Sequence, residues 1–88
     1  MKQNMFGEWY VDSPEDDLSP YVEWSTDEVN AEIGCEVDGE NAGKWFFEIR
    51  FNEDGERAFN SIACFDSEDE VREYLKEFVD ADNVEVIE

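Results

Sequence analysis

Residues 27–38 alternate between apolar and polar side chains, and this pattern restricts the fold more than any other feature of the chain. Strict alternation predicts a β-strand with one face buried and the other in water. Four of the six even positions are acidic, and no Lys or Arg lies between them. The apolar odd positions are Val29, Ala31, Ile33, Cys35 and Val37. We therefore expect a strand over 28–38.

A helix is the competing interpretation of this stretch, because Ser25 and Glu28 have the spacing of a capping box. A helix would place Ala31 roughly 200° around the axis from Val29, which breaks the apolar stripe. Gly34 also disfavours a helix interior. The strand is the better prediction on both counts.

A second alternating segment, 44–51, is followed by a turn at 52–55 and by the apolar segment 56–65, which predicts an antiparallel hairpin. A two-residue turn at Asp54 and Gly55 would set one register. The facing pairs would then be Phe51 with Ala58, Phe47 with Ile62, and Trp45 with Cys64. A longer turn with a bulge would shift this register by one residue, and the sequence leaves both registers open.

A helix is predicted after Ser67, which caps its first turn while Glu70 completes a capping box. The residues that follow have the i, i+3, i+4, i+7, i+8 spacing of one apolar helix face. They are Val71, Tyr74, Leu75, Phe78 and Val79. The acidic residues at the start of this helix also suit the positive end of its dipole.

Shorter strands are expected at 5–11, 21–24 and 83–88, with an exposed loop at 12–20. Because no linker or internal repeat divides the chain, we expect one acidic domain over 1–88. The predicted fold class is α+β. It combines a twisted, mostly antiparallel sheet of four to five strands with one helix of the C-terminal half packed on one face.

The chain has 26 acidic residues and six basic ones, for a net charge of −20. Self-repulsion of this size destabilises a compact state, and solubility alone needs a net charge of only about 2–8. The 41% apolar and 15% aromatic content nevertheless indicates a packed core, since disordered acidic tails lack aromatic residues. The excess charge therefore requires a functional explanation.

Charge and composition exclude several classes of partner and compartment. Repulsion disfavours direct binding to nucleic acid or to an anionic membrane. No segment approaches the ~20 apolar residues of a membrane span. Two distant cysteines without a CxxC spacing indicate a reduced, cytoplasmic protein, which for a phage protein means the host cytoplasm.

The residue types needed for common chemistry are missing from the sequence. The chain has no histidine, which removes Ser-His-Asp and Cys-His systems and any histidine-bound metal. Cys35 and Cys64 are expected to be inert core thiols. Acidic loops are present, but none has the spacing of a calcium-binding loop. We expect no catalytic residues, no cofactor and no metal site, and hence no enzyme.

Three acidic groups are candidate surfaces for binding a partner. They are the strand row Glu28, Glu32, Glu36 and Asp38; the helix row Glu70, Glu73, Glu77 and Asp80; and the loop cluster Glu15, Asp16 and Asp17. Residues on one face of a strand are about 6.7 Å apart. Phosphates of one DNA strand are spaced by about 3.4 Å along the axis, so two adjacent acidic rows would approach the charge density of DNA.

In size, net charge and α+β pattern, the chain resembles the DNA-mimic inhibitors as a class. These are small acidic proteins, often encoded by phages, that occupy the DNA site of restriction enzymes, CRISPR effectors, repair glycosylases or nucleoid proteins. The resemblance implies anti-restriction or anti-CRISPR activity through binding to a basic nucleic-acid-binding protein. Members of the class share no common sequence, so the resemblance assigns no site residues.

Three other interpretations of the acidity stay open at the level of sequence. The first is a halophile-adapted cytoplasmic domain, in which the charge serves solvation. The second is an adaptor or chaperone for a basic protein such as a histone. The third is an acidic domain without a special partner. An exposed edge strand, 5–11 or 83–88, could also pair with a second copy to form a homodimer.

Overall fold

The computed structural model describes residues 2–7, 9–16, 28–76, 79 and 84–87. The strand expected at 21–24 lies outside them. The described elements are β1 (Lys2–Gln3), β2 (Trp9–Val11), β3 (Val29–Cys35), β4 (Trp45–Phe51), β5 (Arg57–Ser61), α1 (Glu68–Leu75) and β6 (Val84–Ile87).

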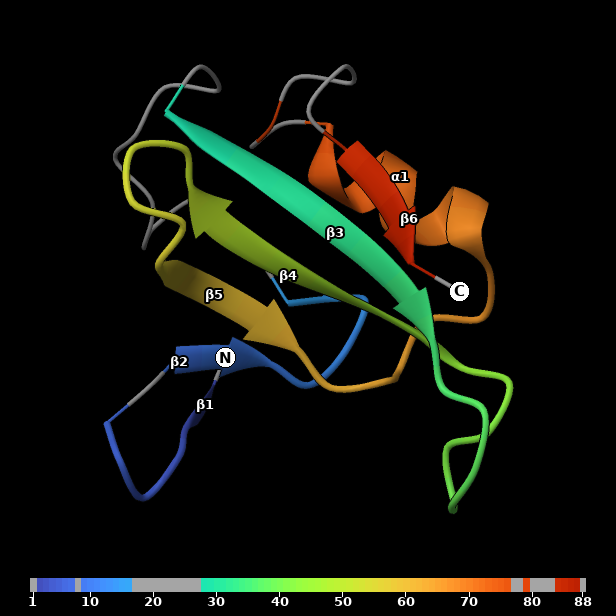
Figure 1. Ribbon diagram of the computed structural model, residues 1–88. Coiled ribbons are helices and arrows are strands. Elements are labelled where there is room, and N and C mark those ends of the chain that lie inside the picture. Colours follow the sequence, from blue (N-terminus) through green and yellow to red (C-terminus); the bar gives the residue numbers. More distant parts are fainter. Residues whose placement is uncertain (1, 8, 17–27, 77–78, 80–83, 88) are drawn as a thin grey trace.

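The strands form one twisted sheet in the order β1-β2-β5-β4-β3-β6, and α1 packs on one side of it (Figure 1). Three of the five neighbouring pairs are antiparallel, whereas β2–β5 and β3–β6 are parallel. The predicted α+β class is confirmed. Counting the two-residue β1, the sheet has one strand more than the upper limit of the prediction.

The strand predicted over 28–38 is confirmed as β3, but it ends at Cys35. Beyond that residue the chain turns back toward β4. The Glu36 N–H donates to the Lys44 carbonyl at 2.8 Å, and the Gly43 N–H donates to the Glu36 carbonyl at 2.8 Å. Gly43 has φ +89°, a left-handed conformation that glycine adopts without steric cost.

Around Ile49 the hairpin of β4 and β5 adopts the register shifted by one residue, so the two-residue turn was the wrong alternative. Ile49 faces Phe59, and a bulge follows between Ile49 and Arg50. The Phe51 N–H donates to the Glu56 carbonyl, which makes 52–55 the loop. The extra residue increases the local twist of the ladder, as β-bulges do.

The N-terminal segment differs more from its prediction. Only Trp9–Val11 of the expected strand 5–11 is extended, because 4–7 forms the turn of a hairpin with β1. The Asn4 side chain accepts from the Phe6 N–H at 2.9 Å, and this local bond competes with strand formation. β1 therefore occupies the edge expected for 5–11, while β6 lies at the other edge as predicted.

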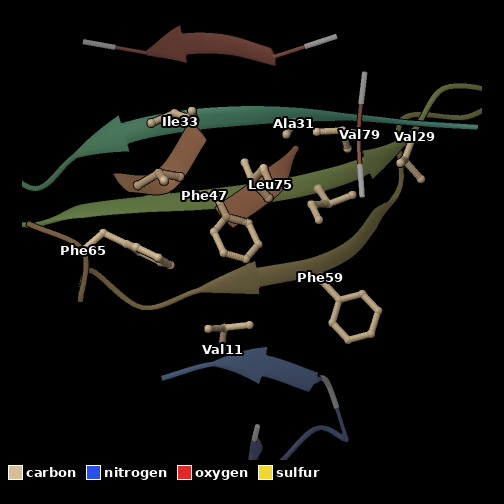
Figure 2. Close-up of a cluster of buried hydrophobic side chains, with 11 residues drawn as sticks. Val11, Val29, Ala31, Ile33, Phe47, Phe59, Phe65, Leu75 and Val79 are labelled. Carbon is tan, nitrogen blue, oxygen red and sulfur yellow. The ribbon is translucent and has the colours of Figure 1, made fainter. Parts of the chain in front are cut away.

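The core lies between the sheet and α1, with side chains from β2, β3, β4, β5 and α1 (Figure 2). Its buried members are Val11, Val29, Ala31, Ile33, Phe47, Ile49, Phe59, Phe65, Val71, Leu75 and Val79. Tyr74 adds an aromatic contact, with ring centroids 5.6 Å from Phe47 and 5.3 Å from Phe65. The core thus includes the central odd positions of β3 and β4 and the described part of the predicted helix stripe, whereas Cys35, Trp45 and Phe51 at the strand ends are only partly buried.

Because side chains alternate across a strand, the remaining positions point to the other side of the sheet. We call this side the open face, since among the described residues no helix packs on it (Figure 1). Its described side chains include Lys2, Tyr10, Asn30, Glu32, Phe46, Glu48, Arg50, Arg57 and Asn60. The fold therefore presents two different surfaces, one beside α1 and one across the bare sheet.

Candidate acidic interface

All six basic residues of the chain lie in the described part, and each contacts a carboxylate. The contacts are Lys2 with Asp12, Lys44 with Asp66, Arg50 with Glu32 and Glu48, Arg57 with Glu48, Arg72 with Glu68, and Lys76 with Glu73. Every Lys and Arg side chain is thus engaged within the chain. The excess of carboxylates over bases therefore determines how the surface interacts with a charged partner.

The predicted strand row is not a continuous line on β3. Of its four residues only Glu32 lies within the strand, while Glu28 precedes it and Glu36 and Asp38 follow it. The face is also interrupted at Gly34, because the ring of Phe46 lies so close that a Cβ there would be 2.4 Å from it. Sequence alternation alone did not reveal this aromatic cover from the neighbouring strand.

Glu32 also has basic neighbours that the sequence separates from it. The Arg50 Nε lies 3.9 Å from a Glu32 oxygen, and Arg50 Nη2 lies 3.1 Å from Glu48. Arg57 approaches the same Glu48 at 3.5 Å. These residues come from β3, β4 and β5, so cross-strand pairing supplies the bases that are missing along β3 itself. The open face is consequently mixed in charge.

The start of α1 is acidic and capped by side-chain hydrogen bonds. Glu68, Asp69 and Glu70 occupy its first turn, where negative charge favours the helix dipole. The Ser67 hydroxyl accepts from the Glu70 N–H at 3.2 Å, as predicted for the cap. The Glu70 carboxylate accepts from the Asp66 N–H at 3.1 Å, which holds the segment before the helix against it.

The loop that follows β2 lies beside this helix start. Pro14 lines one surface hollow together with Phe65, Glu70, Glu73 and Tyr74. Asp16 of the loop cluster and Glu70 of the helix row both act on the charge of Cys64, so the structure brings part of these two predicted groups near one thiol although they are more than 50 residues apart in sequence.

Within that loop, the Asp16 carboxylate accepts from the Asp12 N–H at 3.2 Å. The Ser13 hydroxyl accepts from the Glu15 N–H at 3.2 Å. These bonds give the acidic loop a defined shape. Its last predicted member, Asp17, lies outside the described residues, as do Glu77 and Asp80 of the helix row.

The Cys64 thiol lies where these acids converge. Burial, together with the charges of Asp12, Asp16 and Glu70, raises its pKa to about 11, while the charge of Lys44 acts in the opposite direction. A thiolate there would meet both low polarity and nearby carboxylates. Cys64 and Cys35 are both half-buried free thiols, so each is less buried than the sequence predicted.

We call the acidic side chains of the helix start and of the loop beside it the acidic end and define it as Glu15, Asp16, Asp66, Asp69, Glu70 and Glu73. Sequence reasoning identified four of these six residues and missed Asp66 and Asp69. The run DSEDE at 66–70 contains both, and its charge density was the available signal. The ion pairs of Asp66 and Glu73 with lysines are exposed, and such pairs contribute little to stability. Both acids can therefore exchange partners readily.

Comparisons of the chain with protein-family models, with curated proteins and with solved structures find no match. Among the described residues, no helix has the length and apolar character needed to cross a membrane. In the same part of the chain, no three Asp, Glu or Cys side chains are grouped as metal ligands.

Proposed function

We propose that this chain is a DNA-mimic inhibitor that binds the nucleic-acid site of a DNA- or RNA-binding protein through its acidic end. One observation carries the proposal: every base is engaged within the chain, while the net charge is −20. A surface of this kind attracts sites built of Arg and Lys and repels most others. No catalytic step is part of the proposal.

The spacing of charges at the acidic end supports mimicry of a phosphate backbone. Residues of a helix rise 1.5 Å each, so Glu70 and Glu73 are separated by about 4.5 Å along the axis. Phosphates of one DNA strand are separated by about 3.4 Å. The loop beside the helix contributes Glu15 and Asp16, so the acidic surface consists of charges from the helix and charges from the loop.

Rigidity of the acidic end supports tight binding. The Ser67 cap, the Glu70 bond to the Asp66 N–H and the Asp16 bond to the Asp12 N–H hold the backbone of both segments. A surface fixed before binding loses less conformational entropy in the complex. We therefore propose that the backbone of the acidic end keeps its conformation on binding and that only side chains adjust.

The test begins with proteins that bind heparin from a cell lysate, passed over the immobilised chain and eluted with duplex DNA. A protein that elutes is purified, and its binding to labelled DNA is measured by fluorescence anisotropy with increasing amounts of the chain. We expect the chain to displace the DNA. The variant Asp69→Lys/Glu73→Lys should weaken this inhibition by about 100-fold, because two attractive contacts become repulsive.

The matched control is Glu53→Lys/Glu56→Lys, which changes the net charge equally at the other end of β4. Both residues are exposed in the described structure. Inhibition by this control should weaken by less than about tenfold, since salt screens the effect of the two reversed charges beyond about 8 Å at physiological ionic strength. Equal loss from both variants would mean that only the overall field acts, and it would overturn the acidic end as the binding surface.

A further inference from the structure

A hollow of about 300 Å³ lies at the acidic end, where the loop after β2 meets the start of α1. Its described lining consists of Pro14 from the loop, Phe65 from the segment before the helix, and Glu70, Glu73 and Tyr74 from the helix. Three of these side chains are apolar or aromatic, and two are carboxylates. The hollow therefore combines apolar walls with negative charge.

The aromatic part of the lining is fixed by the core. Phe65 is fully buried, and its ring centroid lies 5.3 Å from that of Tyr74 in an edge-on arrangement. The Tyr74 ring also lies 5.6 Å from Phe47, measured between centroids. Tyr74 and Pro14 are both half-buried, so each still presents some surface to solvent. This apolar surface is formed before a ligand binds, which reduces the entropy lost on binding.

The two carboxylates are three residues apart on α1, so they lie on the same side of the helix. Glu70 is half-buried, and one of its oxygens accepts from the Asp66 N–H at 3.1 Å. A carboxylate has about four acceptor positions, so this bond orients Glu70 and leaves it able to accept others. Glu73 pairs with Lys76 at 2.8 Å, but the two side chains are 72% and 64% exposed. A pair of this kind is weak, so a partner's base can replace Lys76.

No Lys or Arg of the described residues is among those that line the hollow. The other base near it is Lys44, which donates a hydrogen bond to Asp66. That bond, together with the charges of Asp66 and Glu70, raises the pKa of Lys44. Lys44 is therefore held at Asp66, outside the lining. A cation within the hollow itself has to come from another molecule.

We propose that this hollow, which we call the arginine site, binds one arginine side chain of the target protein. The aliphatic stem packs on Pro14 and Tyr74, while the guanidinium group donates to Glu70 and Glu73. Guanidinium is planar and more weakly hydrated than the ammonium group of lysine, so it suits a site with apolar walls. A volume of about 300 Å³ is at the lower limit for small-molecule pockets, which fits a single side chain. As a contact with a target, this inference rests on the proposed function and names the side chain that the acidic end holds.

NMR titration of the full chain with N-acetyl-argininamide tests the arginine site without any target protein. N-acetyl-lysinamide has the same charge, and N-acetyl-citrullinamide has nearly the same shape without the charge. We expect the arginine probe to shift the amide signals of Glu15, Glu70 and Tyr74. It should bind about fivefold more tightly than the lysine probe and at least about tenfold more tightly than the citrulline probe. Equal binding of the arginine and lysine probes would overturn the proposal, because net charge alone would then explain it.

Glu70→Gln/Glu73→Gln should weaken binding of the arginine probe by about tenfold, since both carboxylates of the lining lose their charge. Glutamine keeps an oxygen for the Asp66 N–H, and circular dichroism establishes that the fold is retained. The matched control Glu15→Gln/Asp69→Asn removes two charges of the acidic end that are not part of the lining. It should weaken the probe by less than about threefold, because only the screened field changes. Equal loss from the two variants would also overturn the arginine site.

Competition with DNA for a target protein separates this inference from the proposed function. A chain that displaces DNA but binds the arginine and lysine probes equally keeps the proposed function and loses the arginine site. A chain that binds the probes as predicted but displaces no DNA has a guanidinium site, and the role of that site in holding a target is then overturned with the proposed function.

Discussion

The reactivity of Cys64 tests whether the acidic loop and the helix start converge as the structure shows. Burial, with the charges of Asp12, Asp16 and Glu70, raises the pKa of this thiol from 9.0 to about 11. At neutral pH that difference leaves about 100-fold less thiolate than an ordinary cysteine has. Because the thiolate is the reactive form, alkylation should be slower by about the same factor.

The assay uses iodoacetamide at neutral pH and follows labelling by mass spectrometry in a Cys35→Ser background, with a small free thiol as the reference. Asp16→Asn/Glu70→Gln removes two of the charges while keeping an oxygen to accept each backbone N–H. The pKa of Cys64 should fall in this variant, so labelling should accelerate. It should remain slower than the reference, because burial is the largest cause of the raised pKa.

The control is Glu53→Gln/Glu56→Gln, which removes two charges from the loop at the far end of β4. We expect this control to label at the rate of the parent protein. Labelling of the parent at the rate of the free thiol would refute the burial of Cys64. Equal acceleration in the two variants would refute the convergence of Asp16 and Glu70 on this site.

Three further predictions concern stability. Leu75→Ala should lower the free energy of unfolding by about 2–5 kcal/mol, because this core side chain is fully buried, and urea denaturation measures the loss. Ser67→Ala should cost about 0.5–2 kcal/mol through loss of the bond to the Glu70 N–H, whereas Ser67→Asp should retain most of the stability in the same assay. The parent chain should melt cooperatively at about 0.05 M salt, as measured by circular dichroism; a need for molar salt would favour halophilic adaptation over the proposed function.

Elements with a strong local period were predictable from the sequence. β3 and β4 bury the odd positions in the middle of each strand, and α1 begins after Ser67 as its capping box indicates. Both patterns depend on residues that are near one another in the chain, so few alternatives compete. The end of β3 at Cys35 was harder to predict from the sequence. It depends on the hydrogen bonds between Glu36, Gly43 and Lys44 that turn the chain toward β4.

Features that depend on distant residues were not predictable. The β4–β5 register depends on a bulge beside Ile49, which the sequence does not mark. The strand row seemed free of bases because Arg50 is far from Glu32 in sequence, yet cross-strand pairing brings them together. The same holds for the acidic end, where Pro14 and Glu70 meet only through the tertiary fold.

Competition for one site is the most direct test of the proposed inhibition. A captured target protein is mixed with fluorescently labelled chain, and unlabelled duplex DNA is added at constant salt while anisotropy reports the bound fraction. We predict that the apparent Kd of the chain rises in proportion to the DNA concentration, with no ternary complex in sedimentation. An apparent Kd that reaches a plateau, or a complex that holds target, DNA and chain together, would contradict the account.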